Sequence, residues 1–188
     1  LKVVGIVILL ATANIAFHLE AHLSGMAAYS ARASIALVVT LIGVIGGRIV
    51  PSFTRNWLAR QGEGRMPTPF NRFDVVVMAT GIAALVAWIV APSGHIVAAM
   101  LGIAGALHLV RLARWAGERT LRDRLVLILH VAYAFVPAGF LLTALSALDL
   151  IAPGAGVHAW TGGAIGTMTV AVMTRASLGH TGCALSAS

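Results

Sequence analysis

The chain is poor in charge. Only 10% of its 188 residues are charged, and only six of them are acidic, whereas 59% are hydrophobic. Soluble domains carry about 25% charged residues, so this chain has too little charge to cover a surface that faces water. Its mean hydropathy is +0.93. These values exclude an ordinary soluble domain and predict an integral membrane protein whose main partner is the lipid bilayer.

Cysteine is almost absent, since Cys183 is the only one. A single cysteine excludes an internal disulfide framework and a metal site built from several thiolates, and we assign Cys183 no role. The sequence does not begin with methionine, and residues 1–23 are too long and too uniformly apolar for a signal peptide. We therefore expect this chain to be a piece of a longer protein.

Acidic residues are also too few to balance the basic ones, which leaves a formal net charge of +7. Such an excess can indicate binding to nucleic acid. Here the basic residues cluster between apolar segments rather than along one face of an amphipathic helix. The pattern therefore indicates that the basic residues set the orientation of membrane helices, and it excludes nucleic acid as a partner.

Six segments are apolar and close to the length of about 20 residues that a bilayer core of roughly 30 Å requires of a helix. They are Val3–Leu23, Ala33–Val50, Phe73–Ala91, Ile96–Val110, Leu125–Leu148 and Val157–Thr174. The fourth is short, and we expect it to continue to about Trp115. The alternation that a spanning barrel needs is missing. The sequence predicts an all-α integral membrane protein in which residues 1–188 form one bundle of about six helices.

The basic residues also predict the orientation. With six alternating spans, twelve of the thirteen lysines and arginines fall on one side, and only Arg32 falls on the other. Most of the twelve lie in two predicted loops, Gly46–Arg72 and Arg111–Arg124. Because basic loops stay in the cytoplasm, we expect both loops and both termini to be cytoplasmic.

Small residues predict where helices approach each other closely. The spacing of Gly162 and Gly166 in the sixth span, and of Ala98, Gly102 and Ala106 in the fourth, resembles the small-xxx-small motif of membrane helices. Glycine and alanine are common in all membrane helices, so these motifs indicate no more than a tight bundle. Pro137 lies inside the fifth span and is expected to kink it.

The seven histidines are the main candidates for chemistry, because an ionisable residue within a membrane is by default a functional hypothesis. Asn14, His18 and His22 recur at i, i+4 and i+8 and form one polar stripe. Two imidazoles one turn apart can hold one metal ion, or one can hold it while the other forms a hydrogen bond. Glu20 lies on the opposite side of this helix and is expected at an interface between helices.

His108 and His130 lie on adjacent antiparallel spans, each near the cytoplasmic boundary, and they can face each other. Arg111 follows His108 by one turn, where it suits either a haem propionate or a snorkelling anchor. Met168 and Met173 can be soft copper ligands or ordinary packing residues. The residues alone leave both pairs of alternatives open.

Several long strings resemble the NnrS family. The strings are Gly46–Leu58, His108–Trp115, His130 with Pro137, and His158–Gly182. These proteins are bacterial inner-membrane proteins linked to nitric oxide and nitrosative stress, and they are often encoded with denitrification functions. The resemblance implies haem and copper as cofactors and nitric oxide as a possible ligand. It also implies about twelve spans in the full-length protein, so that this chain would be the carboxy-terminal half and an amino-terminal half would be missing.

The resemblance also implies particular site residues. The metal ligands would be His18, His22, His108, His130, His158 and His180. The cofactor-binding residues would be His108, His130, Arg111, Arg55 and Arg175, in which the arginines neutralise a haem propionate or another anion. Arg48, Asn56, Trp57 and Ser177 belong to the same polar strings and are expected to hold the helix ends at the cytoplasmic side.

Three functions therefore stay open. The first, and the one that the resemblance favours, is a protein with haem or copper that acts in the nitric oxide response. The second is a cytochrome of the b type that passes electrons to a partner, and the third is a transporter or channel with a proton path of histidines and no metal. The chain has no adjacent histidine pair and no carboxylate in the middle of a span, so we assign no catalytic residue.

Overall fold

The computed structural model describes residues 2–181 and is an all-α membrane bundle, as predicted. The helices are α1 (Lys2–Ser24), α2 (Ala28–Leu58), α3 (Arg72–Val90), α4 (His95–Ala113), η1 (Gly117–Arg119), α5 (Arg124–Ser146), α6 (Gly154–His158), η2 (Ala159–Gly166) and α7 (Thr167–His180). Five of these, α1 to α5, are long and apolar enough to cross a membrane. The expected sixth span is also helical, but it consists of α6, η2 and α7 in succession.

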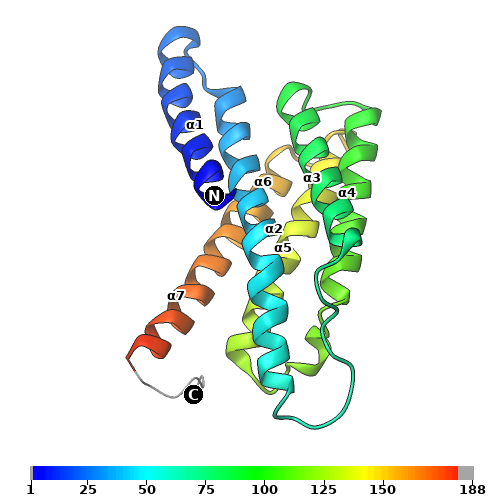
Figure 1. Ribbon diagram of the computed structural model, residues 1–188. Coiled ribbons are helices and arrows are strands. Elements are labelled where there is room, and N and C mark those ends of the chain that lie inside the picture. Colours follow the sequence, from blue (N-terminus) through cyan, green and yellow to red (C-terminus); the bar gives the residue numbers. More distant parts are fainter. Residues whose placement is uncertain (1, 182–188) are drawn as a thin grey trace.

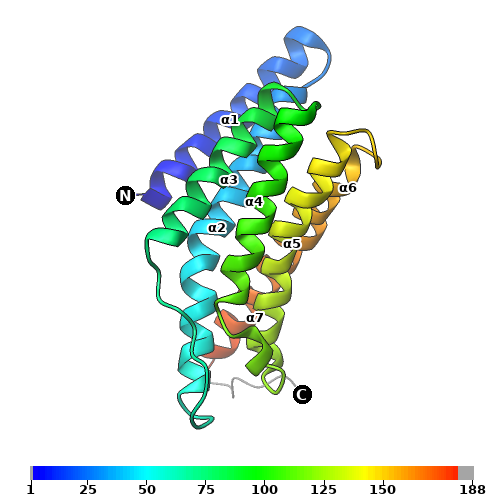
Figure 2. The same cartoon turned by 90° about the vertical axis from the view of Figure 1, so that its right-hand side faces the viewer.

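Helices α2, α3, α4 and α5 form the body of the bundle, and α4 and α5 share its largest helix contact. Figures 1 and 2 show α1 beside the first part of α2, and Figure 1 shows α7 diverging from the lower part of α2. The core is centred on α5, where Leu129, Tyr133, Val136 and Phe140 are almost completely buried. The expectation that both ends of the chain lie on the cytoplasmic side stays a prediction.

The predicted loop after Val50 was placed too early, because α2 continues as a helix to Leu58. The reason is packing, since Val50, Thr54 and Leu58 recur every four residues and all three are buried. With 31 residues, α2 is about 46 Å long at 1.5 Å per residue, which exceeds the hydrocarbon core of roughly 30 Å. The helix is therefore longer than a hydrocarbon core requires, and Pro51 lies inside it.

The two basic loops bind each other through arginine side chains and backbone carbonyls. Arg119 Nη1 donates to the carbonyl of Arg65 at 2.7 Å, and Arg55 Nη2 donates to the carbonyl of Pro67 at 2.9 Å. The backbone N–H of Thr68 donates to the carbonyl of Arg114 at 3.0 Å. The bonds of Arg119 and Thr68 tie the segment before α3 to the residues that follow α4, and the bond of Arg55 ties the same segment to α2.

Close contact between α5 and the sixth span depends on glycines other than those predicted. A Cβ on Gly139 would overlap the indole of Trp160, and a Cβ on Gly156 would overlap Thr143. By contrast, nothing lies within 4 Å of the position that a Cβ would take on Gly162 or on Gly102. The prediction of tight packing from small residues was therefore wrong for Gly162 and Gly102, whereas Ala98 is buried as expected.

The sixth span contains a π-helical segment, η2, between two α-helical parts. Trp160 lies in this segment, is fully buried, and donates from Nε1 to the carbonyl of Val136 at 3.1 Å. That carbonyl directly precedes Pro137, which lies inside α5. The indole thus joins the π segment to the turn of α5 that contains the proline.

Candidate functional site

A buried ion pair lies between α3 and α4. Arg111 Nε donates to Asp74 Oδ1 at 2.9 Å, and the side chains are 1% and 4% exposed. Arg111 Nη1 donates to the carbonyl of Gly43 at 3.0 Å and to the hydroxyl of Tyr133 at 2.8 Å. The guanidinium therefore points into the protein and is paired there, which excludes the snorkelling anchor considered from the sequence.

Glycines of α2 make room for this guanidinium. A Cβ on Gly47 would overlap Arg111, and a Cβ on Gly46 would lie 3.3 Å from the ring of Tyr133. Asp74 is held in place at the start of α3, where its side chain accepts from the backbone N–H of Asn71 at 3.0 Å in a capping box.

His108 is buried next to this ion pair. Its Nδ1 lies 3.0 Å from the Tyr133 hydroxyl, and its ring stacks on Phe140 with 5.3 Å between ring centroids. Arginine can only donate hydrogen bonds, so the Tyr133 oxygen accepts from Arg111 and its own O–H donates to His108 Nδ1. Nε2 then carries the proton of the neutral ring, and we assign this tautomer from the hydrogen bonds.

His108 Nε2 faces a small cavity. A Cβ on Gly81 would lie 3.1 Å from this nitrogen. The cavity measures ≈ 10 Å³ and is lined by Val39, Thr40, Met78, Gly81, Ile82, Leu85, His108 and Phe140. Such a volume is about that of one water-sized probe. A porphyrin does not fit there.

His130 presents a different arrangement. The Thr54 hydroxyl donates to the carbonyl of Val50 at 2.8 Å, so its oxygen accepts from His130 Nε2, which is also 2.8 Å away. The free lone pair of the ring is therefore on Nδ1. This atom is buried and has no hydrogen-bond partner among the described residues. A Cβ on Gly117 would lie 2.7 Å from it, so any larger residue at position 117 would press against Nδ1.

The two buried histidines do not contact each other directly, because the rings of Trp115 and Tyr133 lie between them. Trp115 lies 4.5 Å from Tyr133 and 6.5 Å from His130 between ring centroids, and Tyr133 lies 6.1 Å from His108. Their hydrogen bonds go to Tyr133 and Thr54, which the sequence reasoning missed. Within residues 2–181 no group of three or more histidine, cysteine, aspartate or glutamate side chains is placed to hold a metal ion.

The other predicted histidine ligands, His18, His22, His158 and His180, are exposed, so their roles stay predictions. Glu20 accepts from the backbone N–H groups of Tyr29 at 2.9 Å and Ser30 at 2.8 Å at the start of α2, which agrees with the expected interface.

Arg175 packs over the ring of Phe53, with Cζ 4.2 Å from the centroid, and its Nη1 is buried without a hydrogen-bond partner in the described part of the chain. Cys183 lies outside the described residues.

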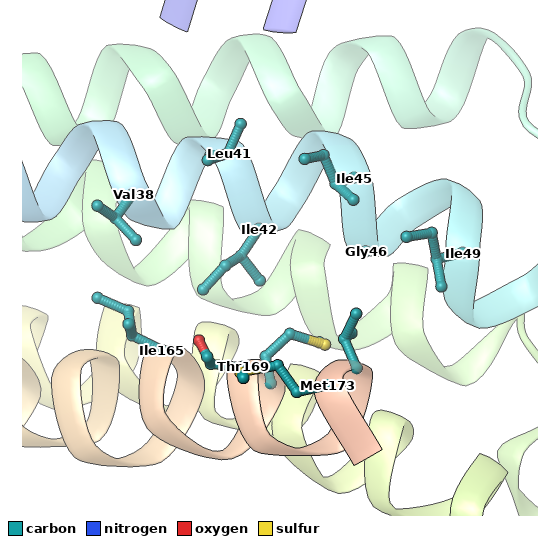
Figure 3. A pocket seen from close by; sticks show the side chains of 11 residues that line it. Val38, Leu41, Ile42, Ile45, Gly46, Ile49, Ile165, Thr169 and Met173 are labelled. Atoms are coloured by element: carbon teal, nitrogen blue, oxygen red, sulfur yellow. The ribbon is translucent and has the colours of Figure 1, made fainter. Parts of the chain in front are cut away.

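An apolar groove of ≈ 300 Å³ runs between α2 and the sixth span. Figure 3 shows Ile42 and Ile49 of α2 on the side that faces α7, with Thr169 opposite. Met168 and Met173 also line this groove, and Met168 is buried whereas Met173 is 63% exposed. No histidine lines it. This apolar groove is therefore separate from both buried imidazoles.

Comparison with known proteins agrees with the resemblance seen in the sequence. A search of curated proteins found no match, and a search of solved structures found none either. The family model described as "NnrS protein" matches residues 1–188. This match gives no support to the expectation of a missing amino-terminal half. Since the match extends along the whole chain, this membrane protein belongs to the NnrS family.

Proposed function

We propose that this chain is a bacterial inner-membrane protein of the nitric oxide response that binds copper at His130. Membership of the NnrS family supports the link to nitric oxide and to a membrane. The observation that carries the copper assignment is the His130 Nδ1 lone pair, which is buried beside Gly117 and has no hydrogen-bond partner among the described residues. A neutral imidazole nitrogen is a preferred copper ligand.

The surroundings of His130 suit a metal ligand. A histidine that binds a metal usually donates its other ring N–H to an oxygen, which fixes the tautomer and orients the ring. Thr54 supplies that oxygen, and the Thr54 hydroxyl is itself committed to Val50. His130 would supply one ligand, and the others would have to come to it from elsewhere, because residues 2–181 offer no ready group of three.

Copper at this position would supply a one-electron redox centre that a small neutral gas can reach through the apolar bundle. The chain's own part is to hold the imidazole and to exclude water. His130 is 6% exposed, and the ring of Trp115 covers it on the side of α4.

Haem does not fit between His108 and His130. Tyr133 and Trp115 fill the path between the two rings, and the cavity at His108 measures ≈ 10 Å³. Arg111 is already paired with Asp74. This packing also supports neither a cytochrome of the b type built on these histidines nor a proton path through Arg111, which does not titrate. Haem held by His18, His22, His158 or His180 remains a prediction from the family.

Copper content tests the proposal. The protein is purified from membranes of cells grown with copper, and copper per chain is measured for wild type, His130→Ala, Gly117→Ala and His95→Ala. His95 is an exposed histidine at the start of α4 and serves as the control. We expect copper to be lost in the first two variants and retained in the third. Unchanged copper in folded His130→Ala protein would overturn the assignment.

Nitric oxide binding and haem content are tested by absorption spectra. Addition of nitric oxide should change the copper spectrum of wild type but not of His130→Ala. A Soret band in the purified protein would show haem. If haem is present, its loss in single alanine variants of His18, His22, His158 or His180 identifies the ligand, and its loss in His108→Ala would contradict the packing argument.

A further inference from the structure

A basic hollow lies at the cytoplasmic end of α2. It measures ≈ 280 Å³ and is lined by Gly47, Arg48, Pro51, Ser52 and Arg55 of α2 and by Thr68, Pro69 and Phe70 of the following loop. The lining contains two guanidinium groups and two hydroxyl side chains. It contains no acidic side chain and no histidine.

The charges of this hollow are not neutralised by the protein. Arg48, Ser52 and Arg55 follow the spacing i, i+4 and i+7, so they share one face of α2. Neither arginine takes part in any of the three ion pairs among residues 2–181. Arg55 makes one hydrogen bond, to the carbonyl of Pro67, which leaves most of its donors free. The hollow therefore suits an anion with several oxygens.

An apolar groove continues from this hollow along the membrane face of α2 and α3. The groove measures ≈ 320 Å³ and is lined by Val44, Arg48, Phe70, Val75, Met78, Ala79, Ile82 and Arg111. Arg48 and Phe70 line both spaces. The charge of Arg111 is already paired with Asp74, so Arg48 is the arginine that marks the junction between the basic hollow and the apolar groove.

The junction lies where the hydrocarbon core should end. Arg48 comes 20 residues after Ala28, the first residue of α2. At 1.5 Å per residue this distance is about 30 Å, which equals the thickness of the hydrocarbon core. Arg48 and the hollow beyond it are therefore at the depth of lipid headgroups, and the groove that contains Ala79 is at the depth of acyl chains.

We propose that an anionic phospholipid of the cytoplasmic leaflet binds here. Its phosphate lies between Arg48 and Arg55, where guanidinium groups and the Ser52 hydroxyl can donate to it. One acyl chain lies in the groove against Val75 and Ala79. The apolar groove is the reason to assign a lipid rather than a free phosphate, and the absence of histidine from both linings argues against a haem propionate.

Native mass spectrometry of the full chain in detergent tests the headgroup site, with phosphatidylglycerol and phosphatidylcholine added in equal amounts. We expect wild type to retain phosphatidylglycerol preferentially. Because each arginine near the surface strengthens binding of anionic lipid about five-fold, Arg48→Gln with Arg55→Gln should lower that preference about 30-fold. The matched control, Arg60→Gln with Arg122→Gln, changes two exposed arginines outside the hollow and should leave it unchanged.

Two further experiments test the acyl groove and the source of the phosphate. Ala79→Phe should lower retention of phosphatidylglycerol by filling the groove, whereas Ala106→Phe, an exposed alanine of α4, should not. Inorganic phosphate in excess should not displace the lipid. Equal lipid preference in wild type and in the folded Arg48/Arg55 variant would overturn the proposal, and so would displacement by phosphate or equal effects of both phenylalanines.

Discussion

The carboxylate of Asp74 lies 2.9 Å from Nε of Arg111 at a place where the first turn of α3 meets the last turn of α4. Both side chains are almost completely buried, and Arg114 Nη1 lies 3.5 Å from the other oxygen of the same carboxylate. One acid thus compensates two arginines inside the bundle. Removal of that acid leaves a buried charge without compensation.

Asp74→Asn should therefore destabilise the protein strongly. Loss of one partner of a buried ion pair costs about 3–5 kcal/mol. The exposed pair of Arg65 and Glu118, with N···O 3.2 Å and side chains 53% and 55% exposed, provides the comparison, and Arg65→Gln should cost less than about 1 kcal/mol. Thermal unfolding in detergent measures both. Similar midpoints for the two variants would mean that the buried pair does not support the fold.

Tyr133→Phe should destabilise the bundle by about 1–3 kcal/mol, because it leaves His108 Nδ1 and one Arg111 donor buried without a partner. The matched control is Tyr29→Phe, since Tyr29 is 58% exposed, and its effect should stay within about 0.5 kcal/mol. Nitrogen NMR of labelled histidine adds a specific readout. The Nε2–H tautomer of His108 should dominate in wild type, and a mixture of tautomers there would contradict the hydrogen-bond assignment.

Thr54→Val should weaken copper binding without removing the proposed ligand. Loss of an oxygen that orients a metal-binding histidine typically lowers affinity about 10–100-fold, and Thr54 accepts from His130 Nε2 at 2.8 Å. Thr80→Val is the control, because Thr80 bonds only to carbonyls of its own helix. Copper titration of stripped protein measures both affinities. Equal affinity in wild type and Thr54→Val would show that this hydrogen bond does not tune the ligand.

Gly139→Ala should destabilise the contact between α5 and the sixth span by about 1–3 kcal/mol, because the added methyl overlaps the buried indole of Trp160. Gly102→Ala is the opposite case. Its methyl meets nothing within 4 Å, so the higher helix propensity of alanine should raise stability by up to about 1 kcal/mol. Unfolding midpoints of the two variants should move in opposite directions, and a shared direction would refute the packing described for these glycines.

The helical bundle could be predicted from the sequence because apolar runs of bilayer length separated by arginines have few other solutions. The end of α2 was placed too early, because Arg48, Pro51 and Arg55 have the composition of a loop. Packing of Val50, Thr54 and Leu58 against the bundle outweighs that local signal. Their four-residue spacing was visible in the sequence and would have extended the helix.

The surroundings of the histidines were harder to predict. Burial of His108 and His130 agrees with their depth in apolar spans, but their partners Tyr133 and Thr54 are neutral hydroxyl residues that occur in most membrane helices. Spacing along one helix cannot show which residue of another helix it meets. The glycine motifs failed for the same reason, since small side chains mark a possible contact on any face, and Gly162 faces open space.

The π-helical turns around Trp160 have a consequence for everything that follows them. A π turn holds one more residue than an α turn, so it sets the angle at which later side chains leave the helix axis. If the hydrogen bond from Trp160 to the carbonyl of Val136 were lost, regular α turns would be free to replace the π turns. Helix α7 would then rotate about its own axis. Arg175 would then leave the ring of Phe53, and the terminal helix would present a different face to the lipid.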